Sequence, residues 1–416
     1  MKKRLGVGLL LGVIVWVGAS AYVGKTFINE MDAALEQAAE DPRVRLLTQE
    51  QEQGWLQSSG TLTWAYQLDL ETELLITSHW QAAHRPAWVS FSGTTALLVN
   101  QDGEPQLDLL DHLDLQPIAF HGQAGLRKMT LQMPLQPLAV AEEHYHIEFS
   151  GGELQLDYAY ASGKQVGKFT TDLLRLGGGQ FDPSKLDLEG LQLNWSQQGV
   201  YPWVRGDLSL QLQRLFFSGA QGEVSFAQPW LKQTLNLDSE HFDLSLELTS
   251  GEVSSSGNEL GQLDLAFSTD HFDGQAMADL VAFFGQEADW QALDEEAMQP
   301  ALDSLNRLLE GSPALNLDQL DITLLTPFSI SQKAQGSARF DGRHLPTDYL
   351  HRVARGEISE EDFAKRFRLE LLFDQINPEL LMLVGIPPFM LDSSAAKQSL
   401  VWEAGELRLN GERLPF

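Results

Sequence analysis

The chain contains no cysteine in 416 residues. Disulfides, thiolate nucleophiles, zinc-thiolate sites and iron-sulfur ligation are therefore excluded together. Familiar catalytic motifs are also missing, because we find no G-x-S-x-G elbow, no H-E-x-x-H helix, no P-loop and no EF-hand loop. These absences argue against the common hydrolases and ATPases. We expect no catalytic residues, no metal and no cofactor.

Basic residues are scarce. The chain has 28 Lys and Arg against 58 Asp and Glu, which gives a formal net charge of -30. Binding to nucleic acid depends on basic side chains that neutralise phosphates, so we expect no nucleic acid partner. The acidic residues are spread through the chain, which indicates a solvated surface rather than a specific cation store.

Long apolar runs are rare, and the clearest one lies at the N-terminus. Leu5–Val23 carries no charge and follows Lys2, Lys3 and Arg4. A helix of this length spans about 28 Å, close to the ~30 Å hydrocarbon core of a bilayer. The sequence therefore predicts a transmembrane signal anchor, with the basic tip in the cytoplasm and the body exported. The small residues around Ala21 also fit a signal-peptidase site, so a cleaved signal peptide is the alternative.

The segment after the anchor has apolar residues from Phe27 to Ala38 at intervals of three and four, and Pro42 ends the pattern. We interpret it as a helical stalk, with a helix packed on the first sheet as the alternative. The predicted organisation is a cytoplasmic tip (1–4), the anchor (5–23), the stalk (24–45), an antiparallel β body (46–275), a helical insertion (276–310), and closing strands with a second helical insertion (311–416).

From about Leu46, apolar and polar residues alternate with a period of two, which is typical of strands with one apolar and one solvated face. Such half-solvated strands belong to antiparallel sheets. The fold class we predict is mainly β with α insertions, in which the N-terminal transmembrane helix precedes an elongated antiparallel β-sheet body covered by helices. The alternating segments include residues 61–70, 105–110, 146–149, 153–160, 186–195, 207–212, 242–248 and 262–267.

Two apolar groups outside the anchor are candidates for binding a hydrophobic ligand. One belongs to the insertion at residues 276–309, and the other is the run Leu380–Leu391, which at ~12 residues is too short to span a bilayer. The run is interpreted either as a plug packed on the sheet or as a surface that touches lipid or a partner. If the insertion covers the leucine-rich face of the strands, that face is a core; if the face is open, it can hold acyl chains. The candidate ligand residues are Phe283, Phe284, Leu380, Leu381, Phe389 and Met390.

The histidines offer weaker signals. His144 and His146 lie two residues apart, which on a strand aims both imidazoles at one face, and Glu142 and Glu143 precede them. Two ligands do not make a metal site without a third, so we interpret this pair as surface histidines of an edge strand.

A family resemblance accompanies these patterns. The chain combines the basic-flanked anchor, the segment Gly54-Trp-Leu-Gln-Ser-Ser59 and a strand-rich body that ends in Leu407-Arg-Leu-Asn-Gly411. In this combination it resembles the YdgA family of bacterial inner-membrane proteins, which contain a domain of unknown function. The His-Gly-Pro segment common in that family is His121-Gly122-Gln123 here, without the proline. In general plan the family is similar to AsmA-like envelope proteins, which are associated with lipid handling, although fold alone does not settle function.

The function we predict is a non-enzymatic, single-pass inner-membrane protein whose periplasmic body binds lipid or another hydrophobic molecule. One alternative is a structural protein that binds an envelope protein partner. Homodimers are a further possibility, because Gly8 and Gly12 form a G-x-x-x-G spacing in the anchor. A second alternative is an exported hydrolase, for which His121, His144 and His146 are the residues to test first.

Overall fold

The computed structural model describes residues 2–39, 43–68, 72–101, 104–141, 145–178, 184–200, 202–220, 222–286, 297–325, 330–374, 376 and 397–414. Strands make up 62% of the chain and helices are few, which confirms the mainly β, antiparallel fold. The chain forms two compact units, with residues 1–175 and 192–201 in unit 1 and residues 176–191 and 202–416 in unit 2. The predicted β body of residues 46–275 therefore contributes to both units.

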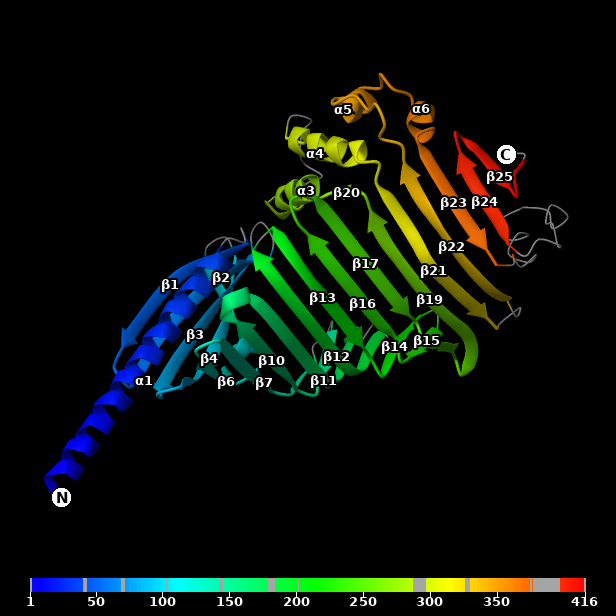
Figure 1. The fold of residues 1–416 in the computed structure, drawn as a ribbon. Coiled ribbons are helices and arrows are strands. Elements are labelled where there is room, and N and C mark those ends of the chain that lie inside the picture. Colours follow the sequence, from blue (N-terminus) through cyan, green and yellow to red (C-terminus); the bar gives the residue numbers. More distant parts are fainter. Residues whose placement is uncertain are drawn as a thin grey trace. The chain divides into compact units, whose positions relative to one another are not determined.

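Unit 1 consists of one long helix and a series of antiparallel strands (Figure 1). Strand β1 pairs with β2, followed in hydrogen-bonded order by β3, β4, β6, β7, β10 and β11. Strand β5 pairs with β4, and β8 pairs with β9. The bounds are α1 Lys2–Ala38, β1 Val44–Gln53, β2 Gln57–Gln67, β3 Thr72–His84, β4 Trp88–Gln101, β5 Glu104–Asp108, α2 Leu109–His112, β6 Ile118–Gly125, β7 Lys128–Leu135, β8 Leu138–Ala141, β9 Tyr145–Phe149, β10 Gly152–Ala159 and a 3-10 turn at Tyr160–Ser162. Strands β11 (Lys164–Gly178) and β12 (Lys185–Val200) contain residues of both units.

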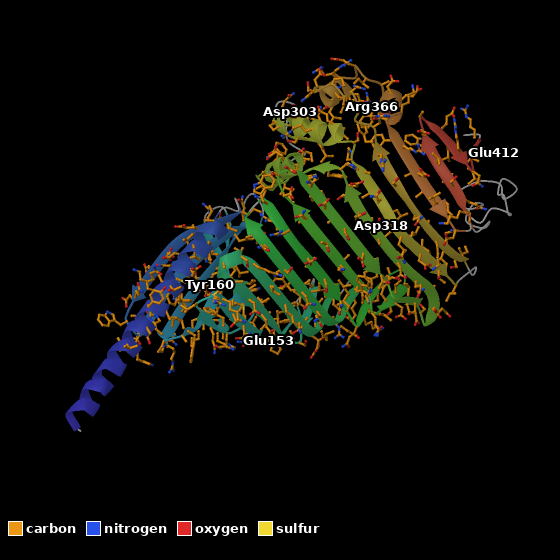
Figure 2. The ribbon with its side chains drawn as sticks, viewed as in Figure 1. Glu153, Tyr160, Asp303, Asp318, Arg366 and Glu412 are labelled. Atoms are coloured by element: carbon orange, nitrogen blue, oxygen red, sulfur yellow. The ribbon has the colours of Figure 1, made fainter. Side chains whose placement is uncertain are left out.

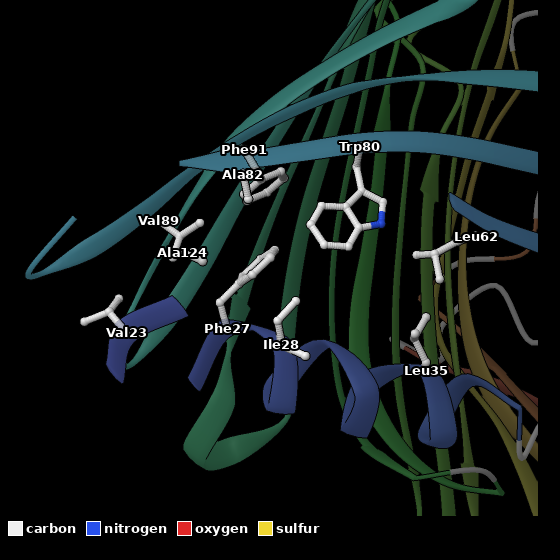
Figure 3. Packing of buried hydrophobic residues seen from close by; sticks show 10 residues of the cluster. All are labelled: Val23, Phe27, Ile28, Leu35, Leu62, Trp80, Ala82, Val89, Phe91 and Ala124. Carbon is white, nitrogen blue, oxygen red and sulfur yellow. The ribbon is translucent and has the colours of Figure 1, made fainter. Parts of the chain in front are cut away.

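Helix α1 packs on the apolar face of this sheet and forms the core of unit 1 (Figure 3). Because side chains alternate between the two faces of a strand, the apolar residues of β2, β3, β4 and β6 all meet the helix. The buried residues are Val23, Phe27, Ile28, Leu35, Leu62, Trp80, Ala82, Val89, Phe91 and Ala124. In the predicted stalk at residues 24–45, the part up to Ala38 belongs to α1 and packs on the sheet, as in the alternative interpretation, whereas Val44 already begins β1.

The N-terminal helix extends well into the predicted anchor, since α1 begins at Lys2. Among the residues that the structure describes, no helix combines the length and the apolar character needed to cross a membrane. The transmembrane role of Leu5–Val23 stays a prediction.

Glycines on neighbouring strands leave room for two aromatic side chains of this sheet. Trp80 of β3 is paired with Gly60 of β2 and with Gly93 of β4, and Gly93 is paired in turn with Phe120 of β6. A Cβ at Gly60 would lie 2.9 Å from Trp80 Cε2, and one at Gly93 would lie 2.5 Å from Phe120 Cζ. The rings therefore lie across their glycine neighbours, an arrangement known to stabilise strand glycines.

Unit 2 is a second series of antiparallel strands (Figure 1). Its order is β13, β16, β17, β19, β21, β22, β23, β24, β25 and β26. Strand β14 pairs with β15, and β15 with β18. The bounds are β13 Trp203–Gln211, β14 Arg214–Gly219, β15 Gly222–Ala227, β16 Trp230–Leu237, β17 His241–Thr249, β18 Glu252–Ser255, β19 Asn258–Asp270, β20 Phe272–Asp273, α3 Gly274–Gln286, α4 Gln299–Glu310, β21 Ala314–Leu324, β22 Ile330–Phe340, α5 Tyr349–Ala354, α6 Glu360–Ala364, β23 Phe367–Phe373, β24 Gln398–Glu403, β25 Glu406–Leu409 and β26 Glu412–Arg413.

Helices α3 and α4 occupy the described part of the predicted insertion at residues 276–310, with α3 beginning two residues earlier. Of the two arrangements left open by the sequence, the described helices do not lie across the leucine-rich strands. The two helices pack on each other through Ala276, Leu280, Ala301 and Leu308, with Phe272 of β20 beside them. Their contacts with the sheet are with β20, β16 and β17, near the turn where β16 ends and β17 begins. The small side chains of Ala276 and Ala301 let the helices approach each other. Part of the apolar surface of α3 stays outside this contact, because Val281 is 43% exposed and Phe284 is 45% exposed.

Candidate hydrophobic-ligand site

An apolar band crosses the sheet of unit 2. In each strand pair, a leucine, phenylalanine or alanine faces a similar residue on the next strand. One cross-strand row consists of Leu210, Leu231, Leu248, Leu265, Leu320, Ala334 and Phe373. The next row contains Leu208, Leu246, Phe267, Leu317, Leu371 and Leu400, interrupted by Gln233 and Gly336. We call these two rows the leucine face.

The leucine face is only partly buried. Except for Ala334, which is 8% exposed, none of its members belongs to the buried core of the chain. In unit 1, by contrast, the corresponding apolar face contains Trp80 at 7% and Val89 at 0% exposure beneath α1. The buried clusters described in unit 2 lie between α3 and α4 and around Ile376, Leu409 and Leu414. Only Phe373 and Leu400, at one end of the leucine face, pack against the second of these clusters in the described structure. The leucine face is therefore accessible in the part of the chain that the structure describes.

The opposite face of the same strands is polar and carries ion pairs. Lys232 lies 3.9 Å from Glu247 across β16 and β17, and Lys333 lies 2.5 Å from Asp321 across β21 and β22. The hydrogen bond to Asp321 raises the pKa of Lys333 above its usual value. Side chains of this face are drawn in Figure 2, where Asp318 marks the irregular position in β21 at which the pairing with β22 shifts. The sheet thus separates a charged face from an apolar one.

Of the six ligand-binding residues predicted from the sequence, the structure describes only Phe283 and Phe284. Phe283 and Phe284 both lie on α3, with ring centroids 5.2 Å apart in an edge-to-face arrangement. Phe283 packs against the α3–α4 cluster, whereas Phe284 is 45% exposed. Leu380, Leu381, Phe389 and Met390 lie outside the described residues, so their proximity to α3 is untested.

The leucine face itself was not named residue by residue from the sequence. The signal for it was present, since segments such as Phe242–Leu248 and Gln262–Phe267 alternate strictly. The alternation within one strand does not give the register of pairing between strands. That register aligns Leu248 with Leu265 and joins the apolar residues of separate strands into one surface.

The histidines do not form a reactive cluster in the described part of the structure. His121 lines a hollow of about 1070 Å³ on the polar face of unit 1, beside Gln81, Ser92 and Gln132. Glu52 is the one carboxylate among the described residues that line this hollow. His146 lies on β9, while His144 is outside the described residues. Within the described ranges, no group of three or more histidine or acidic side chains is placed to hold a metal ion.

Comparison with known proteins gives a family without an assigned function. The model of a bacterial protein family of unknown function, DUF945, matches residues 1–326. The match covers most of the chain, so the chain belongs to this family. No curated protein and no solved structure matches it.

Proposed function

We propose that the protein binds lipid or another hydrophobic molecule on the leucine face of unit 2, as a non-enzymatic component of the bacterial envelope. The observation that carries this proposal is the contrast between two apolar sheet faces of one chain. The face beneath α1 is buried as a core, whereas the leucine face is only partly buried. Soluble proteins rarely expose contiguous apolar patches of more than a few hundred Å², and larger ones mark sites that bind a protein, a membrane or a ligand.

Covering the leucine face removes apolar surface from water, which favours binding of a hydrophobic molecule. Each Å² of apolar surface removed from water contributes about 25 cal/mol, so a surface built from two leucine-rich rows gains much from a cover. The strands of this face already satisfy their backbone hydrogen bonds through antiparallel neighbours. An acyl chain has no hydrogen-bonding groups, so it can cover such a surface without burying an unpaired polar group of its own or of the strands.

The proposed location is the periplasmic side of the inner membrane, reached through a single-pass anchor at Leu5–Val23. Support comes from the length of the apolar run and from the three basic residues that precede it. The resemblance to YdgA proteins, and in general plan to AsmA-like proteins, agrees with a lipid-handling role. That resemblance is an analogy, and the leucine face is the stronger argument.

The test uses full-length protein extracted gently from membranes and analysed by native mass spectrometry for bound phospholipid. The double variant Leu248→Glu/Leu265→Glu places two charges in one cross-strand pair of the leucine face. Its matched control, Ser245→Glu/Ser268→Glu, places the same charges on the same two strands, but on the opposite face.

We expect bound phospholipid in the wild type and in the control, and its loss in the leucine-face variant. If the wild type carries no lipid, or if both double variants retain it equally, the proposal fails. Circular dichroism of both variants checks that the sheet is intact.

A further inference from the structure

A cavity of about 290 Å³ lies in unit 1 between α1 and the apolar face of the sheet. Its walls are almost entirely apolar. The helix contributes Phe27, Glu30, Met31, Ala34 and Leu35, and the strands contribute Leu62, Trp64, Ser78, Trp80, Phe91, Thr95, Phe120, Met129, Leu131, Met133 and Tyr158. The hydroxyls of Ser78 and Thr95 are hydrogen-bonded to each other at 2.9 Å. Tyr160, which follows β10, completes the lining and is labelled in Figure 2.

Two hydrogen-bond donors at this cavity are unusual. The indole Nε1 of Trp80 and the hydroxyl of Tyr160 are both buried, and neither has a hydrogen-bond partner within the described structure. Trp80 as a whole is 7% exposed. A buried donor without an acceptor costs about 1–3 kcal/mol, and such groups in native proteins call for an explanation. A bound molecule with oxygen acceptors offers such donors the partners that they lack.

The charge at the cavity restricts what that molecule can be. Glu30 of α1 lines the same space. Burial, followed by the nearby Glu30 carboxylate, raises the pKa of Tyr160 to about 12. Tyr160 therefore remains a protonated donor at neutral pH. The Glu30 carboxylate repels a second anion in this low-dielectric space, which disfavours a ligand whose acceptor is a carboxylate.

We propose that the space beneath α1 is a binding site for an uncharged, mainly apolar molecule, whose carbonyl, ester or ether oxygen accepts hydrogen bonds from Trp80 and Tyr160. An apolar cavity of ~150 Å³ holds benzene, so this one holds about a dozen heavy atoms, a single acyl chain at most. Met31, Met129 and Met133 let the walls adapt to its shape. The site belongs to unit 1, so it does not depend on the proposed leucine-face function.

The experiment compares three probes of similar size with different polar ends: methyl decanoate, decanoate and undecane. A diazirine-bearing methyl decanoate is photocrosslinked to the full chain held in amphipol, and the labelled peptides are mapped by mass spectrometry. The other two probes serve as competitors. We expect labels in the α1, β3 and β7 peptides of unit 1, displaced at the lowest concentration by unlabelled methyl decanoate and only weakly by decanoate or undecane.

The variants separate the hydrogen bonds from the cavity volume. Tyr160→Phe removes one donor with almost no change in side-chain volume, and we expect it to weaken binding of the ester about five- to tenfold while leaving binding of undecane unchanged. Leu131→Trp fills the space and abolishes labelling in unit 1. Trp55→Phe is the matched control, because Trp55 is 75% exposed and does not line the cavity.

Equal displacement by the ester and the alkane, with no effect of Tyr160→Phe, would show an apolar void without the proposed recognition. Labels confined to unit 2 would also overturn the proposal while supporting the leucine face. If the Leu131→Trp protein does not fold, the Tyr160→Phe result decides the question.

Discussion

Gly24 of α1 lies directly against the imidazole of His84, so that a Cβ at position 24 would overlap ring atoms of His84. His84 is 3% exposed and lies at the end of β3. Its Nε2 is 3.0 Å from the Ser58 hydroxyl, and its Nδ1 is 3.4 Å from the Trp55 carbonyl oxygen. A neutral ring satisfies both contacts by accepting from Ser58 and donating to Trp55. The glycine thus sets how closely the helix approaches the sheet.

Gly24→Ala is expected to weaken the packing of α1 by about 1–3 kcal/mol, because the added methyl group forces the helix away from His84. Gly18→Ala is the matched control, since a Cβ at Gly18 meets nothing within 4 Å. That change should leave stability unchanged or raise it by up to about 1 kcal/mol through helix propensity. Hydrogen exchange of the β3 amides measures both effects. Similar exchange in the two variants would contradict the close approach at Gly24.

His84 should make the stability of unit 1 depend on pH. Burial lowers its pKa below the usual value of 6.5, with the Trp55 hydrogen bond as a smaller opposing effect. The unfolded state therefore binds more protons than the folded state below pH 6.5, and the free energy of unfolding falls as the pH falls. One such group contributes up to about 1.4 kcal/mol per pH unit.

Urea unfolding between pH 6.5 and about pH 5 tests this dependence in wild type and in His84→Asn. In the plot of the free energy of unfolding against pH, the variant should lack the part of the slope that comes from His84. His79→Asn is the control, because His79 is exposed and bonded to Thr61. An unchanged slope in His84→Asn would exclude His84 as its source.

Phe27 should contribute more to helix packing than any exposed aromatic residue. Its ring stacks on Phe91 at 5.6 Å and meets Trp80 edge-to-face at 6.0 Å. Phe27→Ala should cost about 3–5 kcal/mol in local stability, seen as faster exchange in β3 and β4. Trp55→Ala removes a larger but 75% exposed side chain, and it should change exchange by about 0.5 kcal/mol or less. Equal effects would mean that α1 is not held by this contact.

Much of the fold follows from local pattern, as β17 and β19 show. The alternation in Phe242–Leu248 predicts a strand with one apolar face, and the structure confirms it. Likewise, a serine three residues before an acidic residue is typical of a helix start, and the Ser359 hydroxyl at the start of α6 accepts a hydrogen bond from the Asp362 amide at 3.1 Å. These features depend on residues close in sequence, which is why they can be predicted.

Long-range packing could not be predicted in the same way. The sequence shows that Leu62 and Leu246 both lie on apolar strand faces, but not that α1 buries only the first of them. The sequence left open whether the insertion at residues 276–310 covers the leucine-rich strands, and the structure shows Ala276 and Ala301 in the contact between α3 and α4. The cavity beneath α1 depends on the register that pairs Trp80 with Gly60 and Gly93, and alternation alone does not give a register.

The central claim is that the leucine face of unit 2 contacts hydrophobic ligand. It is tested most directly by a photocrosslinking amino acid placed at Leu246 in one protein and at Glu247 in another, in living bacteria with isotopically labelled phospholipid. These neighbours lie on opposite faces of β17. We predict lipid adducts from position 246 and few or none from position 247. Equal adducts at both positions, or adducts at 246 only with the chain's own residues 380–391, would contradict the account.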